Sequence, residues 1–210
     1  MSTAHRSRQT DGALKHTPIR TRSRQARFVE SGMGQSQGDR VPDERKPVND
    51  PRELFLHELG DILYAERTLV KALPRMAQEA TESTLRDAFE KHLSETEQHV
   101  TNIEKAFEMV GETAKAEKCP GIEGLKKEHD EFVSNEEPST DVLDMFLTGA
   151  AARTEHYEMA AYTGLITMAK ALGETDAANL LGENLKQEKA ALETVTTISE
   201  KLASKIPANA

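Results

Sequence analysis

The chain has 210 residues, enough for one domain and a tail, and its composition favours helix because Trp is absent and aromatic residues make up only 4%. The net charge is −9, but residues 1–50 hold ten Lys and Arg against six Asp and Glu, so the other 160 residues carry −13. That acidity excludes an extended nucleic-acid surface on the folded part. No apolar run is long enough to span a membrane and no signal sequence opens the chain, so we expect a cytoplasmic protein without membrane attachment.

Residues 1–50 are rich in Arg, Ser, Gln, Gly and Pro and lack any apolar periodicity, which predicts a disordered basic tail. The first 28 residues hold seven Lys and Arg and one Asp, a pattern that would suit a weak tether to nucleic acid. The alternative interpretation is an unselected extension, with Met33 as the true start.

The first long helix is predicted over residues 51–79, because Asp50 can cap it and Pro51 suits its first position. A second helix over 83–110 ends before Gly111, and the stretch "IEGLKKEHDEFVSN" predicts a short helix inside a long connection. Two more long helices follow, over 140–171 and 175–204. Two hairpins joined by a crossover form an all-α four-helix bundle over residues 51–205, followed by a tail over 206–210.

Cys119 is the single cysteine, so the chain can form no internal disulfide. We expect an unpaired thiol near a loop, in a reducing compartment.

Each long helix carries at least one glutamate in the apolar stripe that should face the core. In the first helix the stripe runs through Leu59, Leu63, Glu66, Val70 and Leu73 in steps of three and four, and Glu66 alone interrupts it. The polar stripe positions are Glu66 in the first long helix, His92, Glu95 and His99 in the second, Glu155 and Glu158 in the third, and Glu188 in the last. One such glutamate could reach solvent at an edge, but four helices sharing the feature indicate a common site.

The depth of these glutamates supports that interpretation. Glu66 lies fifteen residues before the first turn at Thr81, and Glu95 lies fourteen after it. Glu158 and Glu188 lie fifteen residues on either side of the second turn at Gly173. At a rise of about 1.5 Å per residue, both pairs sit roughly 22 Å from their turns, so the carboxylates should converge near mid-bundle.

Buried carboxylates without partners cost several kcal/mol each and repel one another. No stripe lysine or arginine stands at that level. Two bridged metal ions would remove the cost, and oxygen ligands with an imidazole favour iron or manganese.

The segments "AERTLVKALPRMA", "HLSETEQHV", "TEHYEMAAY" and "LLGENLKQEKAAL" resemble the YciF family of bacterial stress-response proteins, dimeric members of the ferritin-like superfamily with a poorly defined activity. The resemblance covers about residues 51–205. It implies a dinuclear site in which a glutamate from each of two helices and a Glu-x-x-His from each of the others bind two metals. It also points to the dimeric branch and away from iron-storage cages.

Carried over by residue, the resemblance implies metal ligands at Glu66, Glu95, Glu158 and Glu188, with Glu155 as an added carboxylate. Neither Glu-x-x-His motif is intact, because Gln98 stands three residues after Glu95 and Ala191 three after Glu188. His99, one turn along from Glu95, is the preferred imidazole ligand, and His92, one turn the other way, is the alternative. His156 should lie at the surface or beside the ligands, and Tyr162 should be a packed tyrosine with a satisfied hydroxyl.

Two functions are compatible with these features. The first is a dinuclear iron or manganese protein of the stress response that acts on peroxide or oxygen. The second is a non-catalytic helical module, tethered to nucleic acid through its basic arm. A homodimer is expected from the resemblance and from apolar positions outside the stripes, namely Phe55, Ile62, Leu69, Phe89 and Phe146.

Overall fold

The computed structural model describes residues 48–207, and in that part of the chain all regular structure is helical. The five helices are α1 (Pro51–Glu79), α2 (Ser83–Met109), α3 (Pro120–Asn135), α4 (Thr140–Leu172) and α5 (Thr175–Ala203). The predicted all-α class is confirmed, and the helix ends lie within two residues of the predicted ones. Most of the predicted disordered tail, residues 1–47, lies outside the described residues, as does the end of the C-terminal tail.

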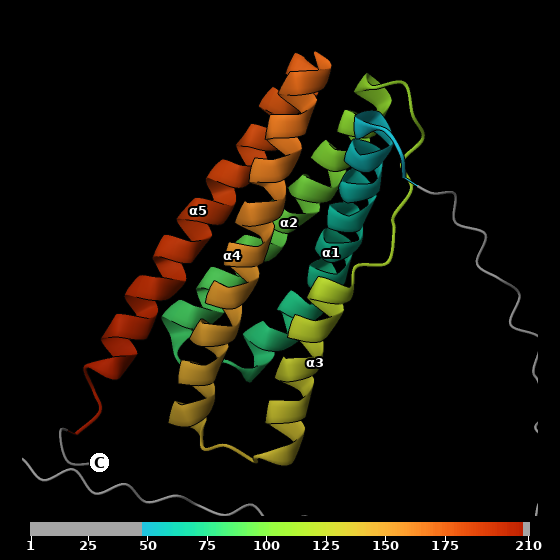
Figure 1. Ribbon diagram of the computed structural model, residues 1–210. Helices are drawn as coiled ribbons and strands as arrows, with labels where there is room; N and C mark the ends of the chain where they lie inside the picture. The colour runs from blue at the N-terminus through green and yellow to red at the C-terminus, as the bar shows by residue number, and fades with distance from the viewer. Residues whose placement is uncertain (1–47, 208–210) are drawn as a thin grey trace, which may run out of the picture. The chain divides into compact units, whose positions relative to one another are not determined.

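The four long helices form the bundle, arranged as two antiparallel hairpins (Figure 1). Within the hairpins α1 packs along α2 and α4 along α5, and between the hairpins α1 faces α4 and α2 faces α5. The fifth helix, α3, belongs to the crossover and packs against α4 and α1 (Figure 1). This square arrangement directs one face of each long helix to a shared interior.

Local sequence accounts for the helix ends. The Asp50 carboxylate accepts hydrogen bonds from the backbone N–H groups of Arg52, at 2.8 Å, and Glu53, at 2.9 Å, at the start of α1. Gly173 ends α4 with a φ of 84°, a conformation that favours glycine. The start of α2 is capped from another helix, because the Asp144 carboxylate of α4 accepts from the N–H groups of Thr81 and Glu82, at 2.8 and 2.9 Å.

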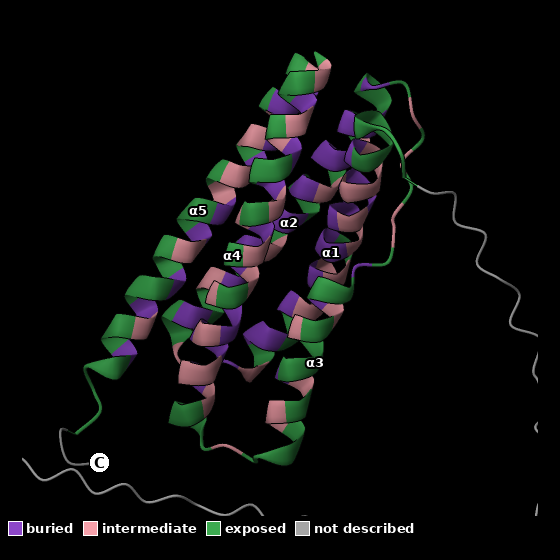
Figure 2. Cartoon of the chain, viewed as in Figure 1, coloured by how far each residue is buried: buried purple, intermediate pink, exposed green. Residues whose placement is uncertain are grey.

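The buried faces of the long helices point into the bundle, as the colouring of Figure 2 shows. Phe55, Ile62, Leu69 and Phe89, expected to support a dimer, are buried within the single chain. Phe146 stacks on Phe132 of α3, with ring centroids 3.8 Å apart. The first four residues therefore offer no free surface to a second copy and Phe146 is half-buried, so the homodimer stays a prediction that rests on the family resemblance.

The crossover is held to the bundle by close backbone packing and by polar contacts. The Glu117 N–H donates to the Gly60 carbonyl of α1 at 2.9 Å, and a Cβ atom at Gly60 would lie 2.7 Å from the Lys115 carbonyl oxygen. Cys119 is the unpaired thiol near a loop that the sequence predicts, because it ends the non-helical segment that precedes α3. It is buried at the N-cap of α3, where its sulfur accepts from the Ile122 N–H at 3.3 Å and lies 2.8 Å from the Tyr157 hydroxyl.

Among residues 48–207, no helix is both long enough and apolar enough to cross a membrane.

Candidate metal centre

Six of the predicted ligands lie together in the middle of the bundle, and we call them the carboxylate-histidine cluster. They are Glu66 of α1, His92 and His99 of α2, Glu155 and Glu158 of α4, and Glu188 of α5. Each is buried, with at most 6% of its surface exposed. The spacing explains the shared direction, because residues three, four or seven apart lie on one face of an α-helix.

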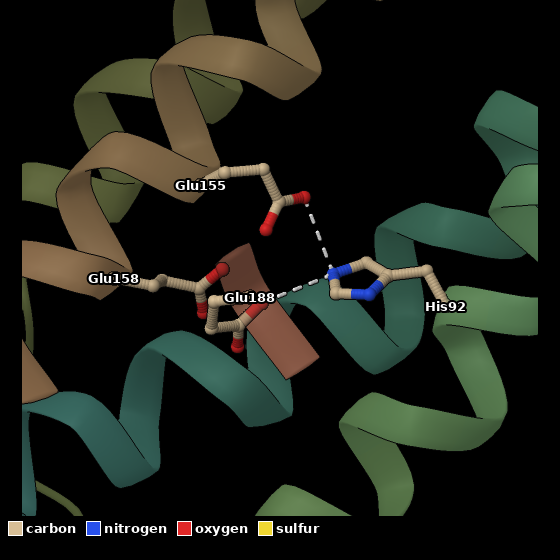
Figure 3. A group of neighbouring side chains, drawn as sticks. All are labelled: His92, Glu155, Glu158 and Glu188. Carbon is tan, nitrogen blue, oxygen red and sulfur yellow. Dashed lines mark ion pairs between the residues drawn. The ribbon is translucent and has the colours of Figure 1, made fainter. Parts of the chain in front are cut away.

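Four side chains form the first group of the cluster. Figure 3 shows His92, Glu155, Glu158 and Glu188 pointing toward one another from α2, α4 and α5. One ligand atom from each lies within 4.8 Å of those of the other three. The Nε2 atom of His92 is 3.3 Å from Glu155 Oε1 and 3.7 Å from Glu188 Oε2. One imidazole nitrogen and three carboxylates can thus share a single cation.

The second group consists of Glu66, His99 and Glu188, with ligand atoms again within 4.8 Å of one another. The Nδ1 atom of His99 lies 2.9 Å from Glu188 Oε1 and 3.3 Å from Glu66 Oε1. Glu188 belongs to both groups, with one oxygen facing each histidine. It therefore has the position of a carboxylate that bridges two cations.

The cluster contains the unsatisfied polar atoms of the protein interior. Eight buried side-chain atoms in residues 48–207 have no hydrogen-bond partner. All eight belong to the cluster: Glu66 Oε2, His92 Nδ1, His99 Nδ1, Glu155 Oε2, both carboxylate oxygens of Glu158 and both of Glu188. Two of the eight, His99 Nδ1 and Glu188 Oε1, lie 2.9 Å apart and pair with each other when His99 is protonated. Buried polar atoms are nearly always paired, so the other six in one place need a partner. All eight are carboxylate oxygens or imidazole nitrogens, and this donor set fits a hard or borderline metal.

A hydrogen bond with Gln187 fixes the His99 ring in an orientation suited to binding a cation. The Gln187 side-chain oxygen lies 2.7 Å from His99 Nε2, so Nε2–H donates to it in the neutral imidazole. The lone pair then resides on Nδ1, the atom that faces Glu66 and Glu188. When no cation is present, hydrogen bonds and charge from Glu188 and Glu66 outweigh burial and raise the pKa of His99 to about 10. Metal binding must therefore displace a proton from His99.

The pKa values of the buried glutamates in the cluster shift in different directions. Burial, together with the charge of Glu188, raises the pKa of Glu155 well above 4.5. Burial, together with the charges of Glu66 and Glu188, does the same to the pKa of Glu158. For Glu188, burial is outweighed by its hydrogen bond and charge interaction with the histidines, which lower its pKa. Without a cation, Glu155 and Glu158 therefore keep their protons to a higher pH than free glutamates do.

A buried hydrogen-bond chain supports Glu66. The Tyr162 hydroxyl donates to Glu66 Oε1 and accepts from the Asn184 amide at 3.0 Å. Asn184 accepts in turn from the Asn102 amide at 2.7 Å. The expectation that Tyr162 is packed with a satisfied hydroxyl is confirmed. The asparagines and Gln187 were not predicted, although Asn184 and Asn102 stand at helical spacing from Glu188 and His99.

Glu95 and His156, which the sequence analysis also singled out, lie outside the cluster. Glu95 belongs to neither group: Oε1 is paired with Lys91, and Oε2 is 3.7 Å from His92 Nδ1. The contact with His92 and the pairing with Lys91 lower the pKa of Glu95 to about 2, against burial. Its assignment as a ligand stays a prediction. His156 is exposed, as expected, with Nδ1 2.7 Å from the Ala152 carbonyl.

A small cavity of about 40 Å³ reaches the cluster, with His92, Glu95 and Glu155 in its wall. One water needs roughly 10–15 Å³ of such space, so the cavity admits about three water-sized molecules. Dioxygen and hydrogen peroxide fit this volume.

Comparison with known proteins identifies relatives. The family model named Domain of unknown function (DUF892) matches residues 50–206. Protein YciF of Escherichia coli K12 is 38% identical over 139 residues, which cover 66% of this chain and 83% of YciF. The crystal structure of the E. coli stress protein YciF matches with a TM-score of 0.72 at 34% identity, covering 76% of this chain and 100% of that one. YcfI from Rhodopseudomonas palustris matches with a TM-score of 0.69 at 38% identity, covering 71% and 94%.

Proposed function

We propose that this chain, which belongs to the DUF892 family of YciF-like proteins, is a dinuclear iron or manganese protein that acts on peroxide or oxygen. The proposal rests on the eight buried side-chain atoms of the cluster that have no hydrogen-bond partner. No other buried side-chain nitrogen or oxygen in the described residues lacks one. A solved relative is described as a stress protein, which supports a role in the stress response.

The residues of the two groups would divide the binding between them. His92, Glu155 and Glu158 would hold one ion, Glu66 and His99 the other, and Glu188 would bridge both. When bound, iron or manganese supplies one-electron oxidation and reduction that can be used on a small oxidant. The preference for these two metals follows from the excess of carboxylate over imidazole ligands and the absence of a thiolate from the cluster.

The surrounding residues would contribute access and orientation. The 40 Å³ cavity beside His92 and Glu155 admits a small oxidant and excludes a larger polar molecule. Gln187 holds the Nε2 proton of His99, which leaves Nδ1 directed at the cluster. Tyr162 donates to Glu66 and thereby orients that carboxylate.

The proposal is tested by metal analysis of full-length protein produced with added iron and manganese. We expect about two metal ions per chain, and metal-dependent consumption of hydrogen peroxide or oxygen. Glu183→Gln provides a control, because Glu183 is an exposed residue of α5, the helix that carries Glu188. A protein that binds neither metal under these conditions contradicts the proposal and supports the non-catalytic helical module. A protein that binds two ions and consumes neither oxidant contradicts the redox role alone.

A further inference from the structure

A second, larger cavity lies outside the square of long helices, between α1, α3 and α4. Its volume is about 280 Å³, and its wall includes Tyr64, Ala72, Leu125 and Ala150. An engineered apolar cavity of about 150 Å³ binds benzene. A molecule of about ten carbon atoms, the size of two fused rings, therefore fits this space.

The buried polar groups around this cavity already have partners, and the charged side chains at its rim are paired except for the exposed Lys71. The Tyr64 hydroxyl donates to Glu123 at 2.7 Å, and His129 Nε2 lies 2.8 Å from Glu79. The hydroxyls of Thr68 and Thr154 donate to backbone carbonyls at 2.9 and 3.1 Å. None of the eight unpaired buried atoms belongs to the cavity wall. A polar ligand would find no buried group left to pair with, so the cavity suits an apolar one.

The cavity adjoins the space that reaches the metal centre. Leu69, Met76 and Thr154 line both the 280 Å³ cavity and the 40 Å³ cavity. His92 and Glu155 line the smaller cavity as well. Three side chains thus form the layer between a space for an organic molecule and a space for a small oxidant.

We propose that the 280 Å³ cavity binds an apolar organic molecule of about ten carbon atoms and holds it one layer of side chains from the metal centre. The binding site itself is independent of the proposed function, whereas its place beside bound metal rests on that function. The ligand is defined by size and by the lack of groups that need hydrogen bonds, as in a fused aromatic or short aliphatic compound.

The first experiment titrates metal-free, full-length protein with naphthalene as a neutral probe, whose own fluorescence reports binding. We expect saturable binding of one probe per chain. Ala72→Leu adds bulk to the wall and should weaken binding at least tenfold, and Ala150→Val should weaken it less. Ala161→Leu is the matched control, because Ala161 is a half-buried α4 residue that lines neither cavity. A melting curve for each variant identifies any that fails to fold, in which case the other wall variant decides.

The outcomes separate clearly. Equal probe affinity in the wild type and in a folded wall variant, or no probe binding at all, overturns the proposed binding site. Affinity that falls as protein concentration rises also overturns it, because a second copy of the chain then covers the cavity.

The second experiment measures the NMR relaxation of naphthalene in the presence of manganese-loaded protein. Paramagnetic relaxation is expected in the wild type and should fall sharply in Glu188→Gln, whose bridging carboxylate is lost. If manganese does not bind, the measurement is repeated with ferrous iron. Failure of both metals to bind, with probe binding intact, contradicts the proposed function and leaves the cavity site standing. Bound manganese and bound naphthalene without relaxation enhancement overturn the placement beside the metal.

Discussion

The carboxylate-histidine cluster and the contact of α3 with the bundle both bury polar side chains, but the two regions satisfy them differently. At α3, donors meet acceptors: the Tyr157 hydroxyl donates to Asp61 at 2.9 Å, and Cys119 lies 2.8 Å from the same hydroxyl. His129 Nε2 and the Glu79 carboxylate likewise form a hydrogen bond with each other. In the cluster, carboxylates face carboxylates and eight atoms have no partner.

The difference shows that burial of polar groups alone does not indicate a binding site. The α3 contact holds the fold together without any added component, because each group pairs inside the protein. The cluster lacks enough protons or cations of its own, so its stability should depend on what binds there. Perturbing the two regions should therefore have different consequences in the presence and absence of metal.

The largest effect is expected for Glu188→Gln, which removes the charge shared by both groups while keeping the shape. Metal content should fall at least tenfold, and the metal-loaded variant should be less stable than the metal-loaded wild type by about 3 kcal/mol, the scale of tight ligand linkage. The metal-free variant should lose less stability relative to the metal-free wild type, because only the interaction of the Glu188 charge with His92 and His99 is lost there. Chemical denaturation in the presence of metal and in the presence of a chelator measures the two stabilities. Changes within about 0.5 kcal/mol in both conditions would show a solvated surface carboxylate.

A pH effect of opposite sign with and without metal is the next expectation. The pKa values of Glu155 and Glu158 are raised by burial, so above pH 4.5 the folded metal-free protein binds more protons than the unfolded chain. The pKa of His99, raised to about 10, acts in the same direction between pH 6.5 and 10. Stability of the metal-free protein should therefore rise as the pH falls from 9 to 5.

With saturating metal the slope should reverse over the same range, because metal binding releases protons and weakens as pH falls. The groups with lowered pKa, such as Glu95 at about 2, matter only below pH 4.5. Chemical denaturation at several pH values provides the measurement. Identical slopes with and without metal would mean that these carboxylates are not the site of binding.

The α3 contact should respond without regard to metal. Tyr157→Phe removes the hydroxyl that joins Cys119 and Asp61, and we expect a loss of about 1–2 kcal/mol of unfolding free energy. The loss should be the same, within about 0.5 kcal/mol, in metal-loaded and metal-free protein. A loss confined to the metal-loaded form would instead couple α3 to the cluster and weaken the distinction between the two regions.

The smallest effect is expected for Glu95→Gln, which tests the boundary of the cluster. Because Glu95 lies outside both groups and pairs with Lys91 at the bundle edge, metal content should stay within about twofold of the wild type and stability within about 0.5 kcal/mol. A tenfold loss of metal would show that Glu95 turns inward to become a ligand, as the sequence pattern predicts.

Local sequence was sufficient to predict the helices and the level of the buried glutamates. The cap at Asp50, the glycine at 173 and the stripe of apolar residues in steps of three and four act within one helix, so their consequences can be read without knowing the fold. Counting residues from each turn then placed Glu66, Glu95, Glu158 and Glu188 at one depth, because an α-helix rises by a constant amount per residue.

Only the tertiary structure decided which of these side chains meet. Glu95 and His99 stand four residues apart on the same stripe, yet His99 faces Glu66 and Glu188 while Glu95 turns toward Lys91. The membership of Glu188 in both groups, the support of His99 by Gln187 and the burial of Cys119 likewise depend on how four helices and a crossover pack. A helical stripe is broad enough to include both the centre and the edge of an interface, and the neighbouring helices determine which part of it is enclosed.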